Sequence, residues 1–179
     1  MRIIGGALKG RHFTPATNFK GRPTTDFGRE GLFNLLRHRI DFDGLKAMDL
    51  FAGTGAISFE LLSRGVAEVT CVEQDGRAIR SIKDSARDLK IEGLKVMRGD
   101  VLRMLRRGGT WKFDLVFADP PFELPEMESL PGRVRKSGFV APGGLFVLEH
   151  GERRDFSEEE GFVETKSYGK VHFSFFEFL

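Results

Sequence analysis

The residues with the clearest chemical potential lie together in the segment Asp119-Pro120-Pro121-Phe122. The carboxylate of Asp119 and the backbone carbonyl of Pro120 can both accept a hydrogen bond from one NH2 group. The two prolines restrict the backbone, and the ring of Phe122 offers a face on which a planar group can stack. This combination suits the exocyclic amine of a nucleic-acid base, so these four residues are the predicted catalytic segment. A plain turn that ends a strand is the competing interpretation.

A glycine-rich segment, Asp49-Leu50-Phe51-Ala52-Gly53-Thr54-Gly55, lies about seventy residues upstream and has the composition of a strand-to-helix turn. Because Gly53 and Gly55 lack Cβ atoms, a ligand can approach the backbone closely there. Glu73 ends the next predicted strand, near the spacing at which an acid meets ribose hydroxyls in dinucleotide folds. The pattern therefore predicts a pocket for an adenosine-containing cofactor.

The predicted cofactor is S-adenosylmethionine and not NAD, because Ser58 stands where the dinucleotide fingerprint has its third glycine. The carboxylate of Asp49 would repel a pyrophosphate but can receive the ammonium of a methionine tail, directly or through water. Asp100 follows the third predicted strand and is placed equally well to accept the adenine amine or to cap the next helix. The predicted cofactor-binding residues are Asp49, Phe51, Gly53, Gly55, Glu73, Gln74, Asp100 and Val101.

Composition excludes several classes of protein. The 179 residues are 40% hydrophobic and 30% charged, as in ordinary soluble domains, and no apolar run approaches the length of about 18 residues that spans a membrane. The chain begins without the features of a signal peptide, which predicts a cytoplasmic location. Cys71 is the single cysteine and the four histidines are scattered, so neither a disulfide nor a metal site is expected.

Charge is unevenly distributed along the chain. Residues 1–39 carry eight Lys or Arg against two acidic residues, whereas the remaining residues carry twenty against twenty-four. A basic arm on a mildly acidic body is the pattern expected where one surface meets phosphates. A terminus that is basic by chance is the alternative.

From Leu45 onward, β-branched apolar runs alternate with amphipathic stretches, which is typical of βαβ units around a parallel sheet. The predicted strands are Leu45–Phe51, Glu68–Glu73, Leu94–Arg98, Phe113–Ala118 and Leu145–His150. The predicted helices are Ala56–Arg64, Arg77–Lys90 and Val101–Arg106, with a broken helix between Pro125 and Val140. Two final runs, Gly161–Lys166 and Val171–Leu179, predict a hairpin. The predicted fold class is α/β, a doubly wound, Rossmann-like, mostly parallel sheet with an antiparallel C-terminal hairpin.

The first forty residues are predicted to form a basic extension, residues 1–40, docked on a main domain that comprises residues 41–179. Within the extension, Arg2–Ile4 and Lys9–Phe13 predict a short hairpin. A helix capped by Thr25 or Asp26 is predicted to run to about Ile40.

Several further motifs extend nearly from end to end of the chain: Arg2-Ile3-Ile4-Gly5-Gly6, Lys9-Gly10-Arg11, Arg22-Pro23-Thr24-Thr25-Asp26, Arg29-Glu30, Leu32-Phe33-Asn34, Ser63-Arg64-Gly65 and Tyr168-Gly169. With the glycine turn and the Asp-Pro-Pro-Phe segment, they resemble the class I S-adenosylmethionine-dependent methyltransferases. Within that class, the resemblance is to the bacterial 16S ribosomal RNA guanine-N2 methyltransferases of the RsmD family.

The resemblance implies a seven-stranded sheet with the cofactor at the carboxyl ends of its strands. It also implies that the substrate is one guanine of 16S ribosomal RNA, within the small ribosomal subunit or its precursor. The predicted RNA-contacting residues are Arg2, Lys9, Arg11, Arg22, Thr24 and Tyr168. Phe27-Gly28 and Gly31 depart from the Arg-Val and Ala that are common in the family, which removes a positive charge and loosens the predicted helix.

Two other functions remain compatible with parts of this pattern. Adenine-N6 methylation of DNA or RNA would use the same carboxylate and carbonyl to hold a different amine. A catalytically silent RNA-binding assembly factor would retain the fold without the activity. The cofactor set with Asp119 argues against the second alternative, because a protein that only binds RNA has no physical need of a cofactor pocket.

Overall fold

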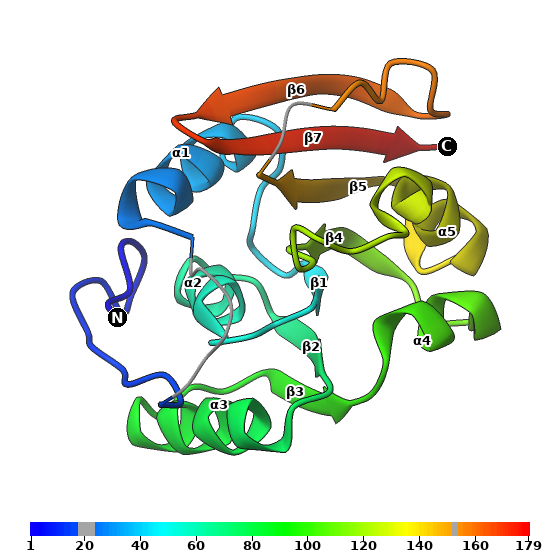
Figure 1. The fold of residues 1–179 in the computed structure, drawn as a ribbon. Coiled ribbons are helices and arrows are strands. Elements are labelled where there is room, and N and C mark those ends of the chain that lie inside the picture. The colour runs from blue at the N-terminus through cyan, green and yellow to red at the C-terminus, as the bar shows by residue number, and fades with distance from the viewer. Residues whose placement is uncertain (18–23, 152–153) are drawn as a thin grey trace.

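The structure is a computed structural model that describes residues 1–17, 24–151 and 154–179. Its centre is a seven-stranded sheet in the order β3-β2-β1-β4-β5-β7-β6 (Figure 1). The strands are β1 Lys46–Leu50, β2 Glu68–Glu73, β3 Leu94–Arg98, β4 Phe113–Ala118, β5 Val140–His150, β6 Phe162–Tyr168 and β7 Val171–Phe178. Strands β1 to β5 pair in parallel, and β7 pairs antiparallel with both β5 and β6. The predicted mostly parallel sheet with an antiparallel hairpin is confirmed.

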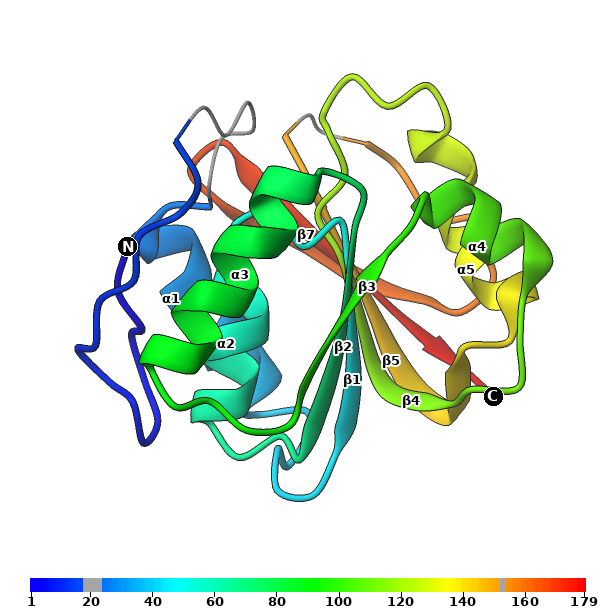
Figure 2. The same ribbon diagram turned by 90° about the horizontal axis from the view of Figure 1, so that it is seen from below.

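Helices cover both faces of the sheet. They are α1 Asp26–Leu36, α2 Ala56–Ser63, α3 Gly76–Asp88, α4 Val101–Arg107 and α5 Leu130–Ser137, with a short 3-10 helix, η1 Met127–Ser129, before α5. Figure 2 shows α1, α2 and α3 on one face and α4 and α5 on the other. This arrangement buries the apolar parallel strands on both sides and confirms the doubly wound α/β class. Within the described ranges, none of the helices has the length and apolar character needed to cross a membrane.

Helix α1 is shorter than predicted. It ends at Leu36 and not near Ile40. Beyond its end the backbone forms 3-10 turns, in which the N–H of His38 donates to the carbonyl of Leu35 at 3.3 Å. Such turns satisfy the last carbonyls of a helix without extending it.

Strand β5 is longer than predicted, because it begins at Val140 and not at Leu145. Its first residue pairs with Phe113, and the register then shifts before the regular ladder starts at Leu145. The predicted broken helix before β5 is present as η1 followed by α5, and a proline occupies the first turn of α5.

The first fourteen residues form what we term the strap, which lies beside α2 and α3 (Figures 1 and 2). The predicted hairpin is reduced to one isolated bridge between Arg2 and His12. Further backbone bonds hold the strap closed, from Ile3 N to Arg11 O and from Phe13 N to Met1 O at 2.9 Å, and from Gly10 N to Ile3 O and Met1 N to Phe13 O at 2.8 Å. A closed loop with one bridge therefore replaces the predicted regular hairpin.

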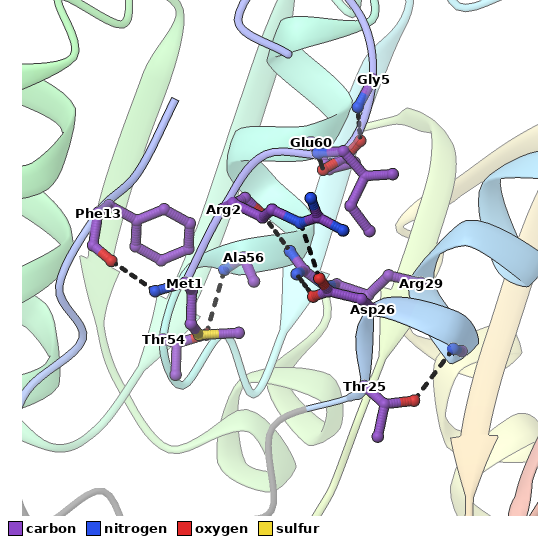
Figure 3. Close-up of polar contacts among 12 residues, drawn as sticks. Met1, Arg2, Gly5, Phe13, Thr25, Asp26, Arg29, Thr54, Ala56 and Glu60 are labelled. Carbon is purple, nitrogen blue, oxygen red and sulfur yellow. Dashed lines mark hydrogen bonds and ion pairs between the residues drawn. The ribbon is translucent and has the colours of Figure 1, made fainter. Parts of the chain in front are cut away.

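A buried carboxylate fastens the strap to α2. Glu60, whose exposure is 0%, accepts hydrogen bonds from Ile4 N at 2.9 Å and Gly5 N at 2.7 Å (Figure 3). The guanidinium of Arg64 donates to the same carboxylate through two nitrogens, at 2.9 and 3.0 Å. The strap is docked because its backbone donors compensate a charge on the main domain.

Helix α1 shares the core of the sheet. Leu32 and Phe33 are fully buried with Phe173 and Phe175 of β7 in one apolar cluster. The extension therefore has no separate core of its own, and the boundary after residue 40 stays a prediction about organisation.

Candidate active site

Acidic side chains gather at the carboxyl edge of the parallel strands. They are Asp49 near the end of β1, Glu73 at the end of β2, Asp119 directly after β4 and Glu149 near the end of β5. The register pairs Ala118 with Leu148, so Asp119 and Glu149 each follow one member of that pair on adjacent strands. In open parallel sheets this edge is where ligands bind.

The glycine turn between β1 and α2 has the backbone of a ligand-binding loop. Phe51, Gly53 and Gly55 have positive φ values of 61°, 55° and 80°. For a phenylalanine this conformation costs about 1–3 kcal/mol, a strain that is concentrated at functional sites. The bonds from Ala52 N to Val72 O (3.0 Å) and from Gly55 N to Ala52 O (2.8 Å) hold the turn in place. Both predicted glycines thus occupy the left-handed region that favours glycine.

The amino end of α2 opens onto the same turn. Its N-cap residue is Gly55, which has no side chain to cap the helix. The hydroxyl of Thr54 accepts one hydrogen bond, from Ala56 N at 3.3 Å (Figure 3). An open helix N-terminus carries a partial positive charge and suits the carboxylate of a ligand.

Glu73 supports the glycine turn from the end of β2. Its carboxylate accepts hydrogen bonds from the backbone nitrogens of Gly53 (2.8 Å), Gln74 (2.8 Å) and Asp75 (2.9 Å). The side chain is half-buried, and a carboxylate has about four acceptor sites, so one is left for a ribose hydroxyl. The contact with ribose stays a prediction, to which the structure adds a fixed orientation of the carboxylate.

Asp49 lies deeper than a direct ligand contact requires. It is 1% exposed and accepts a hydrogen bond of 2.6 Å from the hydroxyl of Ser58, the residue in place of the third glycine. Burial raises the pKa of Asp49 to about 7, the hydrogen bonds from Ser58 lower it, and the negative charge of Glu73 adds to the rise. This burial favours the predicted contact through water over the direct one.

The remaining predicted cofactor-binding residues lie at the start of α4 and directly after β2. Asp100 caps α4 by accepting from Arg103 N at 2.9 Å, which supports the capping interpretation. Its side chain is exposed, so the carboxylate also faces solvent at the edge of the sheet. Gln74 is exposed beside Glu73, and Val101 is buried in the first turn of α4.

The carboxyl group of Asp119 is largely desolvated, yet the residue can be reached by a ligand at the carboxyl edge of the sheet. Burial raises the pKa of its carboxyl well above the usual range, and the negative charges of Glu149 and then Asp49 raise it further. The residue nevertheless keeps partial exposure to solvent. Carboxyl groups perturbed in this way at a sheet edge are candidates for functional sites.

Sequence analysis missed Glu149, whose only signal was its place at the end of the predicted strand Leu145–His150. It is 1% exposed, and the hydroxyl of Thr24 lies 2.8 Å from each of its carboxylate oxygens. Burial raises the pKa of Glu149 to about 7, the hydrogen bond from Thr24 lowers it, and Asp49 raises it again. Thr24 is itself buried with its hydroxyl turned inward, so its position does not support the predicted RNA contact.

Phe122 presents the predicted stacking surface. Its side chain is 39% exposed. A Cβ atom placed on Gly151 would lie 2.6 Å from the Phe122 ring, so only a glycine there lets the ring approach the chain after β5. Pro120 is buried and Pro121 exposed, and Leu124 N donates to the Pro121 carbonyl at 2.9 Å to close the turn. Gly151 is a second residue that the sequence analysis missed.

The predicted RNA-contacting cations differ in availability. Lys9 and Arg11 are exposed on the strap. Arg2 is also exposed, but its Nε pairs with Asp26 at 2.9 Å (Figure 3). Arg22 lies outside the described residues.

Tyr168 does not extend freely from the tip of the hairpin. It is half-buried, and its ring centroid lies 5.8 Å from that of Phe27 in an edge-to-face contact. A Cβ atom on Gly31 would lie 2.4 Å from the Tyr168 ring. Gly31, which was predicted to loosen α1, leaves the space in which the Tyr168 ring packs. Tyr168 therefore has a structural contact with α1, and its contact with RNA stays a prediction.

Arg29 was counted in the basic arm, but it is buried and serves the fold. It donates to Asp26 at 2.6 Å and to the backbone carbonyl of Arg2 at 3.1 Å (Figure 3). The hydrogen bonds from Arg2 and then Arg29 hold the pKa of Asp26 below its usual value. The charge of the first forty residues therefore overstates what is available to phosphates.

Metal chemistry has no candidate ligands in residues 1–17, 24–151 and 154–179, where no three His, Cys, Asp or Glu side chains come together to hold an ion. Cys71 is buried, and burial raises the pKa of its thiol to about 12. A thiolate nucleophile is therefore not formed at neutral pH.

Comparison with known proteins places this site in a family. The model of the family described as Conserved hypothetical protein 95 matches residues 1–177. The Bacillus subtilis protein YlbH is 32% identical over 175 residues, which cover 94% of each chain. Ribosomal RNA small subunit methyltransferase D of Escherichia coli K12 is 35% identical over 150 residues, covering 83% of this chain and 74% of that one.

A solved structure extends the likeness to three dimensions. A hypothetical protein of Thermus thermophilus superposes with a TM-score of 0.85 at 31% identity, and 99% of each chain is covered. The resemblance found in the sequence is confirmed: this chain belongs to the family described as Conserved hypothetical protein 95, the RsmD family of methyltransferases.

Proposed function

We propose that this protein transfers a methyl group from S-adenosylmethionine to the exocyclic N2 amine of a guanine in 16S ribosomal RNA. The observation that carries the proposal is the position of Asp119. Its desolvated but reachable carboxyl stands at the sheet edge that also holds the glycine turn, with the exposed ring of Phe122 three residues along the chain. The name of the Escherichia coli relative supports the choice of small-subunit ribosomal RNA.

The side chains around the glycine turn fit S-adenosylmethionine. Glu73 offers an acceptor for the ribose, and the open amino end of α2 suits the carboxylate of the methionine portion. Asp49 is placed to act on the ammonium through water. The bound cofactor supplies an electrophilic methyl group on a sulfonium.

The residues around Asp119 would prepare the amine for attack. An exocyclic amine is a poor nucleophile because its lone pair is delocalised into the ring. Hydrogen bonds from the NH2 group to Asp119 and to the Pro120 carbonyl draw the nitrogen toward a tetrahedral geometry, which favours the transition state. The N–H donors also stabilise the ionised form of Asp119 and so lower its pKa on binding. The proton that leaves the methylated amine then passes to this carboxylate.

Phe122 would hold the plane of the base. Its exposed ring offers a stacking partner for a base that has left its own stack, which costs a few kcal/mol, or that lies in an open loop. Stacking on one side and two hydrogen bonds at the edge fix the position of the amine. Alignment therefore carries most of the catalysis.

The substrate that this mechanism implies is an accessible guanine within the small ribosomal subunit or its precursor. The proposal accordingly places the protein in the cytoplasm, where ribosomal subunits form. Adenine-N6 methylation would use the same two acceptors, and the name of the Escherichia coli relative favours ribosomal RNA over DNA.

Methylation of purified particles tests the proposal. Small subunits from a bacterial strain that lacks the corresponding enzyme are incubated with the protein and S-adenosylmethionine, and their nucleosides are mapped by mass. One additional N2-methylguanosine is expected with the natural protein, and Asp119→Ala should form it on the order of a hundredfold more slowly. Formation of N6-methyladenosine would favour the adenine alternative, and binding without any new methyl group would favour the silent assembly factor.

A further inference from the structure

Exposed basic residues and one exposed aromatic ring lie near the ends of α4 and α5 and in the loop between α4 and β4. Figure 2 shows these two helices on the face of the sheet opposite the strap. We refer to these exposed residues as the Trp111 surface. It comprises Arg106, Arg107, Trp111, Lys112 and Lys136, all exposed. None of these residues belongs to the candidate active site.

Trp111 is the single tryptophan of the chain and is 49% exposed. Its ring stacks on that of Phe139, with centroids 6.3 Å apart and planes 26° from parallel. Phe139 is buried in the core, so it anchors the indole from below. Tryptophan is on average a highly buried residue, and half of this one remains in water.

The loop that carries Trp111 is fixed between the ends of two helices. Gly108 N donates to Met104 O of α4 at 3.0 Å, and Gly109 N donates to Ser137 O of α5 at 3.3 Å. The side chain of Lys112 donates to the carbonyl of Gly138. The exposed ring is therefore held in one place before any ligand arrives, which lowers the entropic cost of binding.

The cations around Trp111 are not neutralised. No ion pair joins Arg106, Arg107, Lys112 or Lys136 to an acid among the residues that the structure describes, and the partner of Lys112 is a neutral carbonyl. By contrast, Arg135 of the same helix as Lys136 pairs with Glu160 at 3.3 Å. Cations at helix C-termini complement the helix dipole, which accounts for the arginines and for Lys136 but not for an exposed tryptophan among them.

We infer that the Trp111 surface binds an unpaired stretch of the substrate RNA, with a base stacked on the indole and phosphates on the surrounding cations. This inference rests on the proposed function, because it takes RNA as the substrate. A flat ring held among free cations is the combination by which proteins bind single strands without reading their sequence. An acidic protein would use the same cations and could bury the ring as well, so polyglutamate is included as a competing ligand in the test below.

The position of the surface bears on the size of the substrate. Trp111 precedes β4 and Asp119 follows it, so the two lie at opposite edges of the sheet. Six residues of strand span about 20 Å at roughly 3.3 Å per residue. One RNA that reaches both points must extend or fold over several nucleotides. The surface therefore favours a large RNA over a short fragment around the target guanine.

Fluorescence of the sole tryptophan tests the contact directly. A short oligouridylate, which offers bases and phosphates but no methylatable amine, is titrated into the natural protein. Quenching that high salt reverses is expected, whereas inorganic polyphosphate should bind the cations with little quenching. Binding of the oligouridylate without quenching would overturn the inference. Equal quenching by polyglutamate would overturn it in favour of an acidic protein partner.

Variants measure the contribution of the surface to the real substrate. Trp111→Ala should weaken binding to small ribosomal subunits about tenfold, and Trp111→Phe should recover part of the loss. Arg106→Gln with Arg107→Gln should lower the logarithmic salt slope by about 0.7–0.9 for each lost phosphate contact. Arg87→Gln with Lys95→Gln is the matched control, since both cations pair with acids, and it should leave the slope unchanged.

Methylation of small subunits and binding to them separate the proposed function from the inference about the Trp111 surface. If the natural protein methylates small subunits while Trp111→Ala, shown to be folded by its melting curve, binds them with unchanged affinity, this inference alone fails. If the natural protein methylates no guanine, the proposed function fails, and tryptophan quenching still reports on the surface.

Discussion

Two regions of this molecule bury carboxylates in opposite ways. Beneath the strap, Glu60 accepts from two backbone N–H groups and from two nitrogens of Arg64. At the carboxyl edge of the sheet, the donor to Glu149 among the described residues is the hydroxyl of Thr24, and the charge of Glu149 acts on Asp119. Both environments bury a carboxylate, but within the described residues only Glu60 has a guanidinium and backbone N–H groups as donors.

The difference separates a structural charge from a reactive one. A buried carboxylate with a guanidinium and backbone donors is compensated and holds two parts of the chain together. Carboxyls that share an edge with few donors have raised pKa values, as Asp49, Asp119 and Glu149 do. An amine or cation that binds beside such a carboxyl supplies hydrogen-bond donors or positive charge, which lowers its pKa.

The strongest test of this comparison is Glu60→Ala. Removal of one partner of a buried ion pair should cost about 3–5 kcal/mol of stability, because Arg64 and two backbone donors lose their acceptor. Urea unfolding measures the loss. Glu60→Gln retains an acceptor oxygen and should cost less. The folded fraction of either variant should bind S-adenosylmethionine with normal affinity, because the glycine turn and Glu73 are unchanged. A Glu60→Ala protein of unchanged stability would show that Glu60 is not a structural charge.

Asp119→Ala is the converse test. Removal of one preorganised polar group from the transition state should lower turnover on the order of a hundredfold or more, with cofactor affinity nearly unchanged. Asp119→Asn keeps an acceptor oxygen and should retain some activity. Single-turnover methylation of small subunits, with a melting curve for each variant, makes the measurement. If Asp119 only shapes a turn, both variants lose stability together and any folded fraction works normally.

Glu73 stands between the two classes, since it both braces the glycine turn and faces the predicted ribose. Glu73→Ala should weaken S-adenosylmethionine binding about ten- to hundredfold, because a hydrogen bond to a charged group contributes about 1.5–3 kcal/mol. Calorimetric titration gives the affinity. Glu73→Gln keeps one acceptor oxygen and should lose less. Unchanged affinity in a folded Glu73→Ala protein would move the cofactor away from this strand.

The raised pKa of Glu149 should make the free energy of unfolding depend on pH. Glu149 has a pKa of about 7 in the folded protein, above its ordinary value of 4.5. The folded state therefore binds the proton more tightly than the unfolded state, and the stability that this adds below about pH 4.5 is lost as the pH rises through about 7. Glu149→Gln should flatten the decline by about 1.4 kcal/mol per pH unit at most, the limit for one proton.

Urea unfolding at several pH values across this window measures the slope. Glu149→Gln is compared with the natural protein, in which Asp49 contributes a decline of the same sign. Equal slopes in the two proteins would show that Glu149 is ionised in the fold and that its charge is compensated after all.

Local pattern was enough to predict the scaffold and the centre of the site. The alternation of apolar and amphipathic stretches predicts the five parallel strands, because each strand and helix carries its own period. Asp119-Pro120-Pro121-Phe122 could be identified because its chemical groups are adjacent in the chain. The glycine turn could be identified for the same reason.

The residues that were missed depend on contacts that no local pattern contains. Glu149 becomes important only through the register of β4 with β5 and through Thr24, which comes from the other end of the chain. Gly151 matters because a ring from another loop approaches it. Arg29 reads as one more surface cation until tertiary packing buries it.

The space at Gly31 has a consequence for how the chain folds. The glycine admits the ring of Tyr168, so the first helix completes its packing only against the last hairpin. Such a contact between the two ends of a chain closes late, because the entropy of the long loop must be overcome first. During synthesis the part of α1 that packs against Tyr168 and β7 therefore stays uncovered until β6 and β7 have emerged. Gly31→Ala, which would strengthen an isolated helix, should here delay that final step.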